Sequence, residues 1–218
     1  MKKENKENKI NDITLTSQNK KERPFGIGGS DANKLVNGNW IDLYDEKINK
    51  ESIDLSDVLP VQMGNATEQF NREWFAKQTN MLPSQETTVW YNDYIYGNLD
   101  GLIYGTFEGE ETPIAVFEAK HTNAFNATDQ KKLDQVDKYY PQLQHYMMVA
   151  KVKRAYLSMF FGNLKWDYLE VEEDKSFQQK LLSAYDYFWT AIQKENHELV
   201  VNLNWSEYHE HNLNKKVS

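Results

Sequence analysis

Glu118 and Lys120 are the residues whose types and spacing most clearly suggest chemistry. They end the mostly apolar run 113–120, which reads as a buried β-strand. Side chains two apart on a strand project from one face, so the carboxylate and the ammonium should point the same way. Charges at the end of a buried strand are costly unless they are paired or used. Upstream, Asp100 lies in the sequence Asn-Leu-Asp-Gly at 98–101, which is typical of a turn and follows another strand-like run.

An acid followed later by Glu-Ala-Lys suits metal-assisted hydrolysis of a phosphodiester. Mg²⁺ prefers oxygen ligands, typically one or two carboxylates with waters, and Asp100 and Glu118 could supply them. The metal would lower the pKa of a bound water and neutralise charge on the phosphate. Lys120 would orient or help deprotonate that water. Taken alone, the pattern also fits a structural ion pair between Glu118 and Lys120, because such spacings occur often by chance.

Five short motifs follow one another in an order that resembles the YqaJ-like viral recombinase family. This family includes bacteriophage lambda exonuclease and belongs to the PD-(D/E)xK nuclease superfamily. The resemblance covers roughly residues 24–195. The motifs are Gly-Ile-Gly-Gly-Ser-Asp-Ala at 26–32, Met-Gly-Asn-Ala-Thr-Glu at 63–68, Leu-Asp-Gly at 99–101, Glu-Ala-Lys at 118–120 and Gln-Leu-Gln-His-Tyr at 142–146.

The resemblance implies an α/β fold with a restriction-endonuclease-like core, in which a mixed β-sheet is flanked by helices. It also implies a deoxyribonuclease that depends on Mg²⁺ or Mn²⁺, with two ions. Such an enzyme would digest linear double-stranded DNA from the 5′ end and leave a 3′ single strand for a single-strand-annealing partner. Some relatives are ring-shaped trimers, so the resemblance also implies a homo-oligomer.

The resemblance assigns roles to individual residues. Asp100, Glu118 and the Ala119 carbonyl would bind the first metal ion, and Glu68, the acid of a Gly-x-x-x-Glu motif, would support a second. Lys120 would activate water and Gln142 would assist. The residues expected to contact DNA are Ser30, Arg23 and Tyr146. From spacing alone, Glu68 also fits an exposed helix acid and Gln142 an ordinary helix-surface residue.

The glycine-rich motif departs from the family at one point. Where relatives carry a basic residue that contacts the terminal 5′-phosphate, this chain has Pro24 or Phe25, and Arg23 is the nearest cation. Read without the family, the motif is either a phosphate-binding loop before a helix or a turn whose helix is capped by Ser30 or Asp31.

Two other functions stay open at this point. One is an endonuclease, or a nuclease that needs single-stranded ends, within the same superfamily. The other is a catalytically silent DNA-binding or assembly protein on the same fold. Closed circular DNA separates an exonuclease from an endonuclease, and titration with Mg²⁺ or Mn²⁺ separates an enzyme from a silent relative.

Composition sets outer bounds on these functions. The 218 residues contain no cysteine, which excludes disulfides, thiolate metal sites and cysteine nucleophiles. A net charge of −8 argues against a simple non-specific DNA coat protein. The polar N-terminus lacks a secretory apolar region, and no apolar run is long enough for a membrane span. We therefore expect a cytoplasmic protein, in the bacterial host if a phage encodes it.

The chain divides into a flexible arm at 1–22, a nuclease domain at 23–195 and a C-terminal tail at 196–218 that docks on the core or on a neighbouring subunit. We predict a hairpin of 94–100 with 102–107 around Asp100, and a polar irregular segment at 124–136. Further elements expected from periodicity are helices at 40–49, 61–78, 139–151 and 176–194 and strands at 87–91, 154–161 and 165–171. The apolar stripe of the second helix would be Ala66, Phe70, Trp74 and Phe75, and Pro141 would lie in the first turn of the third.

Overall fold

A computed structural model describes residues 25–49, 55–123, 128–201, 203–206 and 208. The predicted arm at 1–22 lies outside these residues. The helices are α1 (Gly29–Val36), α2 (Trp40–Asn49), α3 (Leu59–Thr79), α4 (Asp129–Ala150), α5 (Lys175–Gln193) and the short 3₁₀ helix η1 (His197–Leu199). The strands are β1 (Thr87–Trp90), β2 (Tyr96–Leu99), β3 (Gly101–Phe107), β4 (Glu110–Thr122), β5 (Arg154–Phe161) and β6 (Lys165–Glu172). In the part of the chain that is described, no helix could cross a bilayer.

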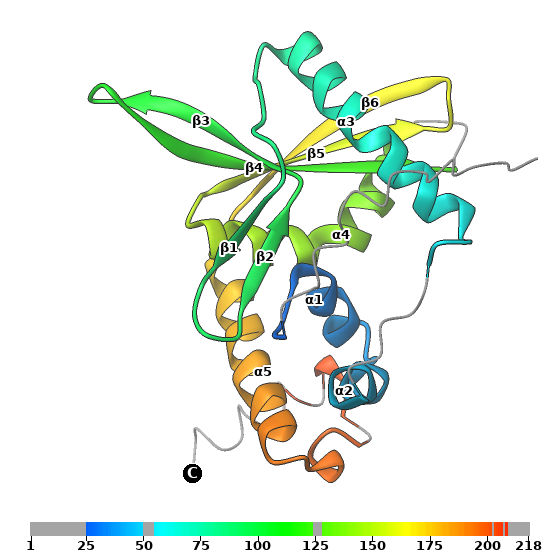
Figure 1. Cartoon of the computed structure of the whole chain (residues 1–218), viewed down its shortest axis with the longest axis vertical. Helices are drawn as coiled ribbons and strands as arrows, with labels where there is room; N and C mark the ends of the chain where they lie inside the picture. Colours follow the sequence, from blue (N-terminus) through cyan, green and yellow to red (C-terminus); the bar gives the residue numbers. More distant parts are fainter. Residues whose placement is uncertain (1–24, 50–54, 124–127, 202, 207, 209–218) are drawn as a thin grey trace, which may run out of the picture.

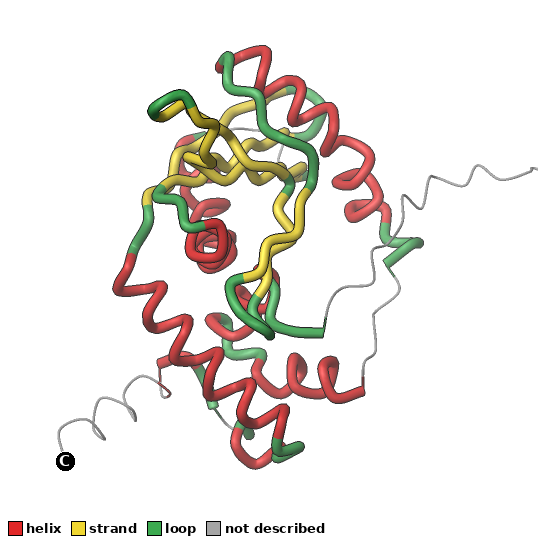
Figure 2. The backbone as a smooth tube through the Cα atoms, turned by 60° about the vertical axis from the view of Figure 1, so that its left-hand side comes forward, coloured by secondary structure: helices red, strands yellow, loops and turns green. Residues whose placement is uncertain are grey.

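A four-stranded mixed sheet in the order β3-β4-β5-β6 lies in the upper part of the molecule in Figure 1, above α1, α2 and α5. Strand β4 is antiparallel to β3 and parallel to β5. A parallel pair needs a long crossover, which α4 provides. Strands β1 and β2 form a separate two-stranded ribbon that runs away from the main sheet (Figure 2). The predicted α/β fold with a mixed sheet flanked by helices is confirmed.

Helices α3 and α4 cover opposite faces of the four-stranded sheet, and the alternation of β4 decides which side chain meets which helix. Phe117 packs with Phe75 of α3, at 5.1 Å between ring centroids. Val116 packs with Leu143 of α4. Burying one such large apolar side chain stabilises the fold by about 1.5–3 kcal/mol. With a period of two, Glu118 shares the α4-facing side with Val116.

The predicted hairpin around Asp100 is wrong. Strand β2 pairs with β1, whereas β3 pairs with β4. Gly101 begins β3, which pairs with β4, so the chain does not fold back onto β2 there. The reversals occur at Asn92, whose Oδ1 accepts hydrogen bonds from two following main-chain N–H groups, and at Glu108 and Gly109, whose positive φ values suit a two-residue hairpin turn. Asp100 therefore joins the two sheets.

The predicted apolar stripe of α3 is wrong for two of its four residues. Ala66 is exposed and Phe70 is 54% exposed, while Phe75 is buried as predicted. The helix instead turns two polar side chains inward. Its buried residues are Asn71, Arg72 and Phe75. Periodicity failed here because the polar pair is satisfied by contacts with distant strands, described below.

Helix α4 begins well before the predicted start at 139. Thr128 is its N-cap, with a side-chain oxygen that accepts from the Lys131 N–H. Most of the segment expected to be irregular is thus exposed helix, and residues 124–127 lie outside the described part. Pro141 falls inside the helix, not in its first turn, and removes one main-chain hydrogen bond there.

Beyond α5, Val200 and Tyr208 are buried in the core cluster around Trp40.

Candidate active site

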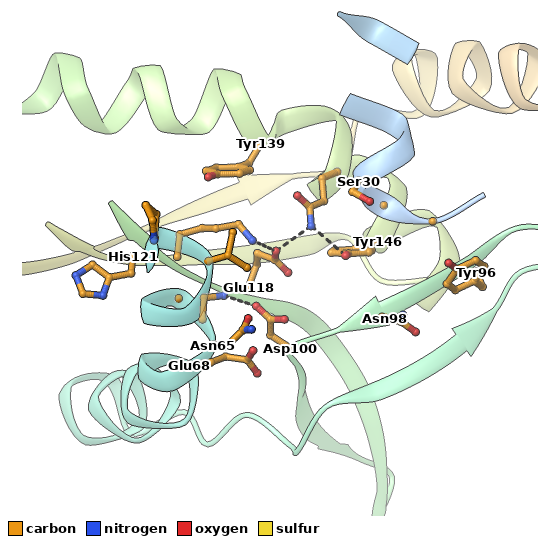
Figure 3. Close-up of a pocket in the computed structure, with 18 residues that line it drawn as sticks. Ser30, Asn65, Glu68, Tyr96, Asn98, Asp100, Glu118, His121, Tyr139 and Tyr146 are labelled. Atoms are coloured by element: carbon orange, nitrogen blue, oxygen red, sulfur yellow. Dashed lines mark hydrogen bonds and ion pairs between the residues drawn. The ribbon is translucent and has the colours of Figure 1, made fainter. Parts of the chain in front are cut away.

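One cavity of ≈ 440 Å³ gathers the charged residues singled out from the sequence. Asp100 lines it from the junction of β2 and β3, Glu118 and Lys120 from β4, and Glu68 from α3. In Figure 3 the labelled carboxylates of Glu68, Asp100 and Glu118 point into the same space. The cavity is also lined by other residues assigned from the sequence, namely Ala119, Gln142, Ser30 and Tyr146. Arg23 lies outside the described residues.

Strand β4 places a carboxylate in the wall of the cavity and an ammonium beside it. Glu118 is 1% exposed, and its Oε1 lies 2.5 Å from Lys120 Nζ. The Lys120 side chain is 23% exposed, so its ammonium reaches the cavity. Tyr139 of α4 forms a second support, with its ring centroid 4.9 Å from Lys120 Nζ. The ion pair and the cation–π contact together fix where the positive charge lies.

Asp100 is tied to β4 through its side chain and to α3 through its main chain. Its Oδ2 accepts a hydrogen bond of 2.8 Å from the Ala119 N–H. Its carbonyl accepts from Arg72 Nη2 at 2.7 Å and from Arg72 Nε at 3.2 Å. The same Nη2 lies 2.9 Å from Glu68 Oε1. A buried guanidinium thus holds two of the acidic residues, and its i,i+4 spacing from Glu68 is a signal that sequence reading missed.

Gln142 is held in one orientation by Asn33 of α1. The Gln142 main-chain N–H can only donate, and it donates to Asn33 Oδ1 at 3.1 Å. Asn33 Nδ2 must therefore be the donor to Gln142 Oε1, at 3.3 Å. That leaves Gln142 Nε2 to donate to Glu118 Oε1 at 2.9 Å and to the Tyr146 hydroxyl at 3.0 Å. Asn33 and Gln142 are too far apart in the chain for spacing to reveal this contact.

This orientation leads to a stability prediction. Asn33→Asp places a carboxylate against Gln142 Oε1, with no N–H left to donate, and an unmatched buried acceptor costs about 1–3 kcal/mol. We expect Tm at pH 7 to fall by roughly 2–12 °C, using about 2–4 °C per kcal/mol. Near pH 4 the introduced carboxyl group becomes protonated and can donate again, so the difference from wild type should shrink. Thermal scans at both pH values test this, and a loss that is equal at both would contradict the donor role. Asn33→Ala is the control, because its effect should not depend on pH.

The carboxylates of the cavity resist ionisation. Burial, followed by the neighbouring charge of Asp100, raises the pKa of Glu118 to about 8. Burial, followed by Asp100 and Glu86, raises the pKa of Glu68 to about 8. Burial also raises the pKa of Asp100 above its usual range, against the opposing charge of Lys120. For Lys120 burial opposes the charge, but the carboxylates of Glu118 and Asp100 outweigh it and raise its pKa. The cavity therefore favours additional positive charge.

Glu118 carries an oxygen that suggests where such charge would sit. Its Oε2 is buried and accepts from no N–H or hydroxyl group of the described residues, whereas Oε1 accepts from Lys120 and Gln142, and the Glu118 carboxyl group also lies within hydrogen-bonding reach of Asp100. Within the same residues, no three His, Cys, Asp or Glu side chains are grouped closely enough to hold a metal ion. A cation here would thus rely on two carboxylates, a main-chain carbonyl and water, a ligand set that suits Mg²⁺. The residues present fit that ion.

Asn71 supports the main chain beneath the ammonium. Its Nδ2 donates to the carbonyls of Lys120 at 3.3 Å and Ser158 at 3.1 Å. The Ser158 hydroxyl donates back to Asn71 Oδ1 at 2.5 Å. This buried amide links α3 to the end of β4 and the middle of β5, so it positions Lys120 without touching the cavity charges. Asn71 lies in a mostly polar part of the α3 sequence, so its burial could not be predicted from the pattern of residues.

Two of the three residues expected to contact DNA, Ser30 and Tyr146, lie at the α1 end of the cavity. Ser30 is in the first turn of α1, and Asp31, three residues after the N-cap Gly28, accepts from the Gly28 N–H at 2.8 Å. Asp31 therefore caps the helix from inside it, and Ser30 does not. Tyr146 is buried, and its ring lies so close to Gly29 that a Cβ there would approach it to 2.3 Å. Phe25 packs on Trp189, at 5.2 Å between centroids.

Comparison with known proteins adds independent information. A family model for the YqaJ-like viral recombinase domain matches residues 19–153. The uncharacterized protein YqaJ of Bacillus subtilis is 26% identical over 178 residues, which cover 77% of this chain and 53% of that protein. The chain thus spans about half the length of the curated relative it matches.

Two solved structures share the fold. An alkaline exonuclease from Laribacter hongkongensis superposes with a TM-score of 0.60 at 13% identity, over 88% of this chain and 94% of that one. A phage-related exonuclease from Haemophilus somnus gives a TM-score of 0.60 at 12% identity, over 78% of this chain and 96% of that one. At such identities the likeness concerns the fold alone.

Proposed function

Because the chain belongs to the YqaJ-like viral recombinase domain family, we propose that it is a Mg²⁺-dependent deoxyribonuclease that degrades linear double-stranded DNA. The observation that carries this proposal is the cavity in which Asp100 and Glu118 meet Lys120, while no N–H or hydroxyl group of the described residues donates to Glu118 Oε2. A buried acid with an unused oxygen is costly unless a ligand completes its surroundings. The fold shared with two exonucleases supports hydrolysis from a DNA end.

The metal ions would be held by acidic and main-chain oxygens. Asp100, Glu118 and the Ala119 carbonyl would hold one Mg²⁺ or Mn²⁺, and Glu68 would help hold a second. Bound ions of this kind lower the pKa of a water ligand and neutralise charge on the phosphate. The raised pKa values of Glu68 and Glu118 support this assignment, because groups that retain protons when buried together exchange them for a cation.

Two other residues would contribute to catalysis, Lys120 through its positive charge and Gln142 by positioning Glu118. In the metal-free protein the carboxylates of Glu118 and Asp100 raise the pKa of Lys120, and its ammonium would serve as a donor to the attacking water or to a phosphate oxygen. Gln142 acts through Glu118, because its Nε2 is shared between Glu118 and Tyr146. We therefore assign Gln142 the role of a positioning residue that keeps Glu118 Oε2 toward the cavity.

The DNA end would be held at the N-terminus of α1. A helix N-terminus carries a partial positive charge and main-chain N–H groups that suit phosphate, and Ser30 adds a hydroxyl on the cavity wall. Phe25 supplies no cation at the place where relatives have one, and in the sequence Arg23 is the nearest basic residue to it. Among the described residues, Lys47 brings an ammonium close to this helix end, since its Nζ lies 2.7 Å from the Asp31 oxygen that accepts from the Gly28 N–H. Digestion would run 5′ to 3′ and leave a single strand.

The test is digestion of end-labelled linear duplex DNA by the purified protein. With Mg²⁺ we expect mononucleotides to be released progressively from the 5′ ends, and with EDTA we expect no release. Comparing 5′-phosphate with 5′-hydroxyl ends measures how far Arg23 and Ser30 replace the missing basic residue.

Closed circular DNA is the matched control substrate. It has no ends, so an exonuclease leaves it intact, whereas nicking would replace this proposal with an endonuclease. If neither DNA is cut and calorimetry detects no Mg²⁺ or Mn²⁺ binding, the chain is a catalytically silent DNA-binding or assembly protein.

Assembly and partners belong to the same proposal. A homo-oligomer, a trimer by family resemblance, would keep the enzyme on DNA between cleavages, and an annealing protein would take up the 3′ strand in the bacterial cytoplasm. Light scattering of the purified chain measures the first, and co-purification measures the second.

A further inference from the structure

The β1–β2 ribbon continues the wall of the cavity on one of its two faces. Strand alternation and the register Trp90↔Tyr96 and Thr88↔Asn98 place these four side chains on the same face. Tyr96 and Asn98 line the cavity, and Figure 3 shows Asn98 between Tyr96 and Asp100. The opposite face is buried, as Leu99 belongs to the core cluster against α4.

Trp90 is the outermost side chain of this face. It is 47% exposed, although its ring packs on Tyr96 at 5.2 Å between centroids and a tilt of 42°. The contact supports one side of the indole and leaves a large part of it to solvent. A second surface hollow begins there, lined by Trp90, Tyr91, Asn92 and Asp93. A large aromatic side chain supported in this way is suited to stack a planar ligand.

We propose that Trp90 is a stacking platform for a nucleobase of single-stranded DNA that extends from the cavity. This inference rests on the proposed nuclease function. The four-residue step from Tyr96 to Asp100 spans about 13 Å at 3.3 Å per residue. A DNA strand advances about 3.4 Å per nucleotide along the axis of a B-form helix and more when it is extended, so it covers that span in about four nucleotides or fewer. A phosphodiester at Asp100 and a base on Trp90 would thus belong to one short stretch of DNA.

The chemistry of the ribbon favours an unpaired base over a duplex. Residues 87–99 contain no lysine or arginine, so phosphate charge is not what this surface would recognise. A base inside a duplex is stacked on its neighbours and offers no ring face, whereas an unpaired base does. Thr88 Oγ1 donates to Asn98 Oδ1 at 2.8 Å, which keeps a polar amide beside the ring for contacts to the base edge or sugar.

The experiment measures binding of the full chain to fluorescein-labelled dT12 in EDTA at fixed salt, so that no bond is cut. Stacking on one aromatic ring changes affinity by about 5- to 150-fold. We expect Trp90→Ala to raise Kd by that factor and Trp90→Phe to retain most of the affinity. Phe107→Ala is the control, because Phe107 is 69% exposed at the tip of the β3–β4 hairpin and should not matter.

A walk of single abasic nucleotides through dT12 makes the test independent of folding effects. The wild type should lose affinity at one position, and Trp90→Ala should be insensitive to that position, since both changes remove the same contact. Equal Kd values for wild type and Trp90→Ala, or identical abasic profiles, would overturn the inference. Duplex digestion by the wild type, measured in parallel, separates the two claims. If the wild type digests duplex DNA but Trp90→Ala binds dT12 as the wild type does, only the stacking platform is refuted. If Trp90→Ala weakens dT12 binding but the wild type digests no DNA, only the nuclease function is refuted.

Discussion

Lys120→Met is expected to lower the rate of nucleotide release from linear duplex DNA by about 10²–10³-fold, the usual effect of removing one charged donor from a transition-state site. Methionine keeps an unbranched side chain but removes the ammonium that lies 2.5 Å from Glu118 Oε1 and 4.9 Å from the centre of the Tyr139 ring. The remaining carboxylates can still attract a cation, so the loss should appear in the maximal rate more than in the Mg²⁺ concentration needed. Initial rates over a Mg²⁺ series measure both.

Two further variants distinguish the effect of the Lys120 charge from the effects of side-chain shape and of a general loss of folding. Lys120→Arg keeps the charge, but its planar fork cannot reproduce the compact contact with Glu118, so we expect an intermediate rate. Lys34→Met removes a partly exposed lysine that pairs with Glu46 away from the cavity and should leave the rate unchanged. An undiminished rate in Lys120→Met, with an unchanged Tm, would remove Lys120 from the mechanism.

The charged strand could be predicted because its signals are local. Glu118 and Lys120 share a face by the two-residue period of a strand alone, and the structure places both on the side of β4 that faces α4. The apolar run around them ensured burial of its central residues. Helix α2 was likewise predicted with its observed bounds, because a full amphipathic repeat lies within its ten residues.

The surroundings of Asp100 could not be predicted because they depend on pairing between distant segments. A turn-like Asn-Leu-Asp-Gly sequence normally indicates a hairpin. Here Ser84 takes the main-chain hydrogen bonds of Leu102 that a hairpin with β2 would use. Its N–H donates to the Leu102 carbonyl at 2.8 Å, and its Oγ accepts from the Leu102 N–H at 3.0 Å. Gly101 allows this approach, since a Cβ there would lie 2.8 Å from the Ser84 carbonyl oxygen. The chain therefore passes from one sheet to the other at Asp100.

The inner side of α3 was misread for a related reason. Asn71 and Arg72 look like surface residues, yet both are buried because one bonds to the Lys120 carbonyl and the other to the Asp100 carbonyl. Hydropathy assigns polar residues to solvent unless a partner is known, and these partners lie far along the chain. The helix thus uses polar burial to hold the cavity and leaves Phe70 at the surface.

Glu118→Gln should make the metal-free protein more stable and the enzyme inactive. Burial, then Asp100, raises the pKa of Glu118 from 4.5 to about 8, so the folded state keeps a proton that the unfolded chain has released between those values. Unfolding free energy therefore falls as pH rises through that window. A neutral amide avoids this loss. We expect Tm of Glu118→Gln in EDTA to match the wild type near pH 5 and to exceed it by roughly 4–10 °C at pH 8.5.

Added Mg²⁺ should reverse that order. A ligand that binds only the folded state raises its stability, so wild-type Tm at pH 8.5 should rise with Mg²⁺ while that of Glu118→Gln should not. Glu46→Gln is the matched control, because Glu46 pairs with Lys34 outside the cavity and its loss should alter neither the pH dependence nor the response to Mg²⁺. A Glu118→Gln protein that is less stable than wild type in EDTA at pH 8.5, or still stabilised by Mg²⁺, would contradict the role of this carboxylate. The physical reason is that Glu118 is buried beside a second carboxyl group, Asp100, and the pairing with Lys120 does not fully offset this cost until a cation is bound.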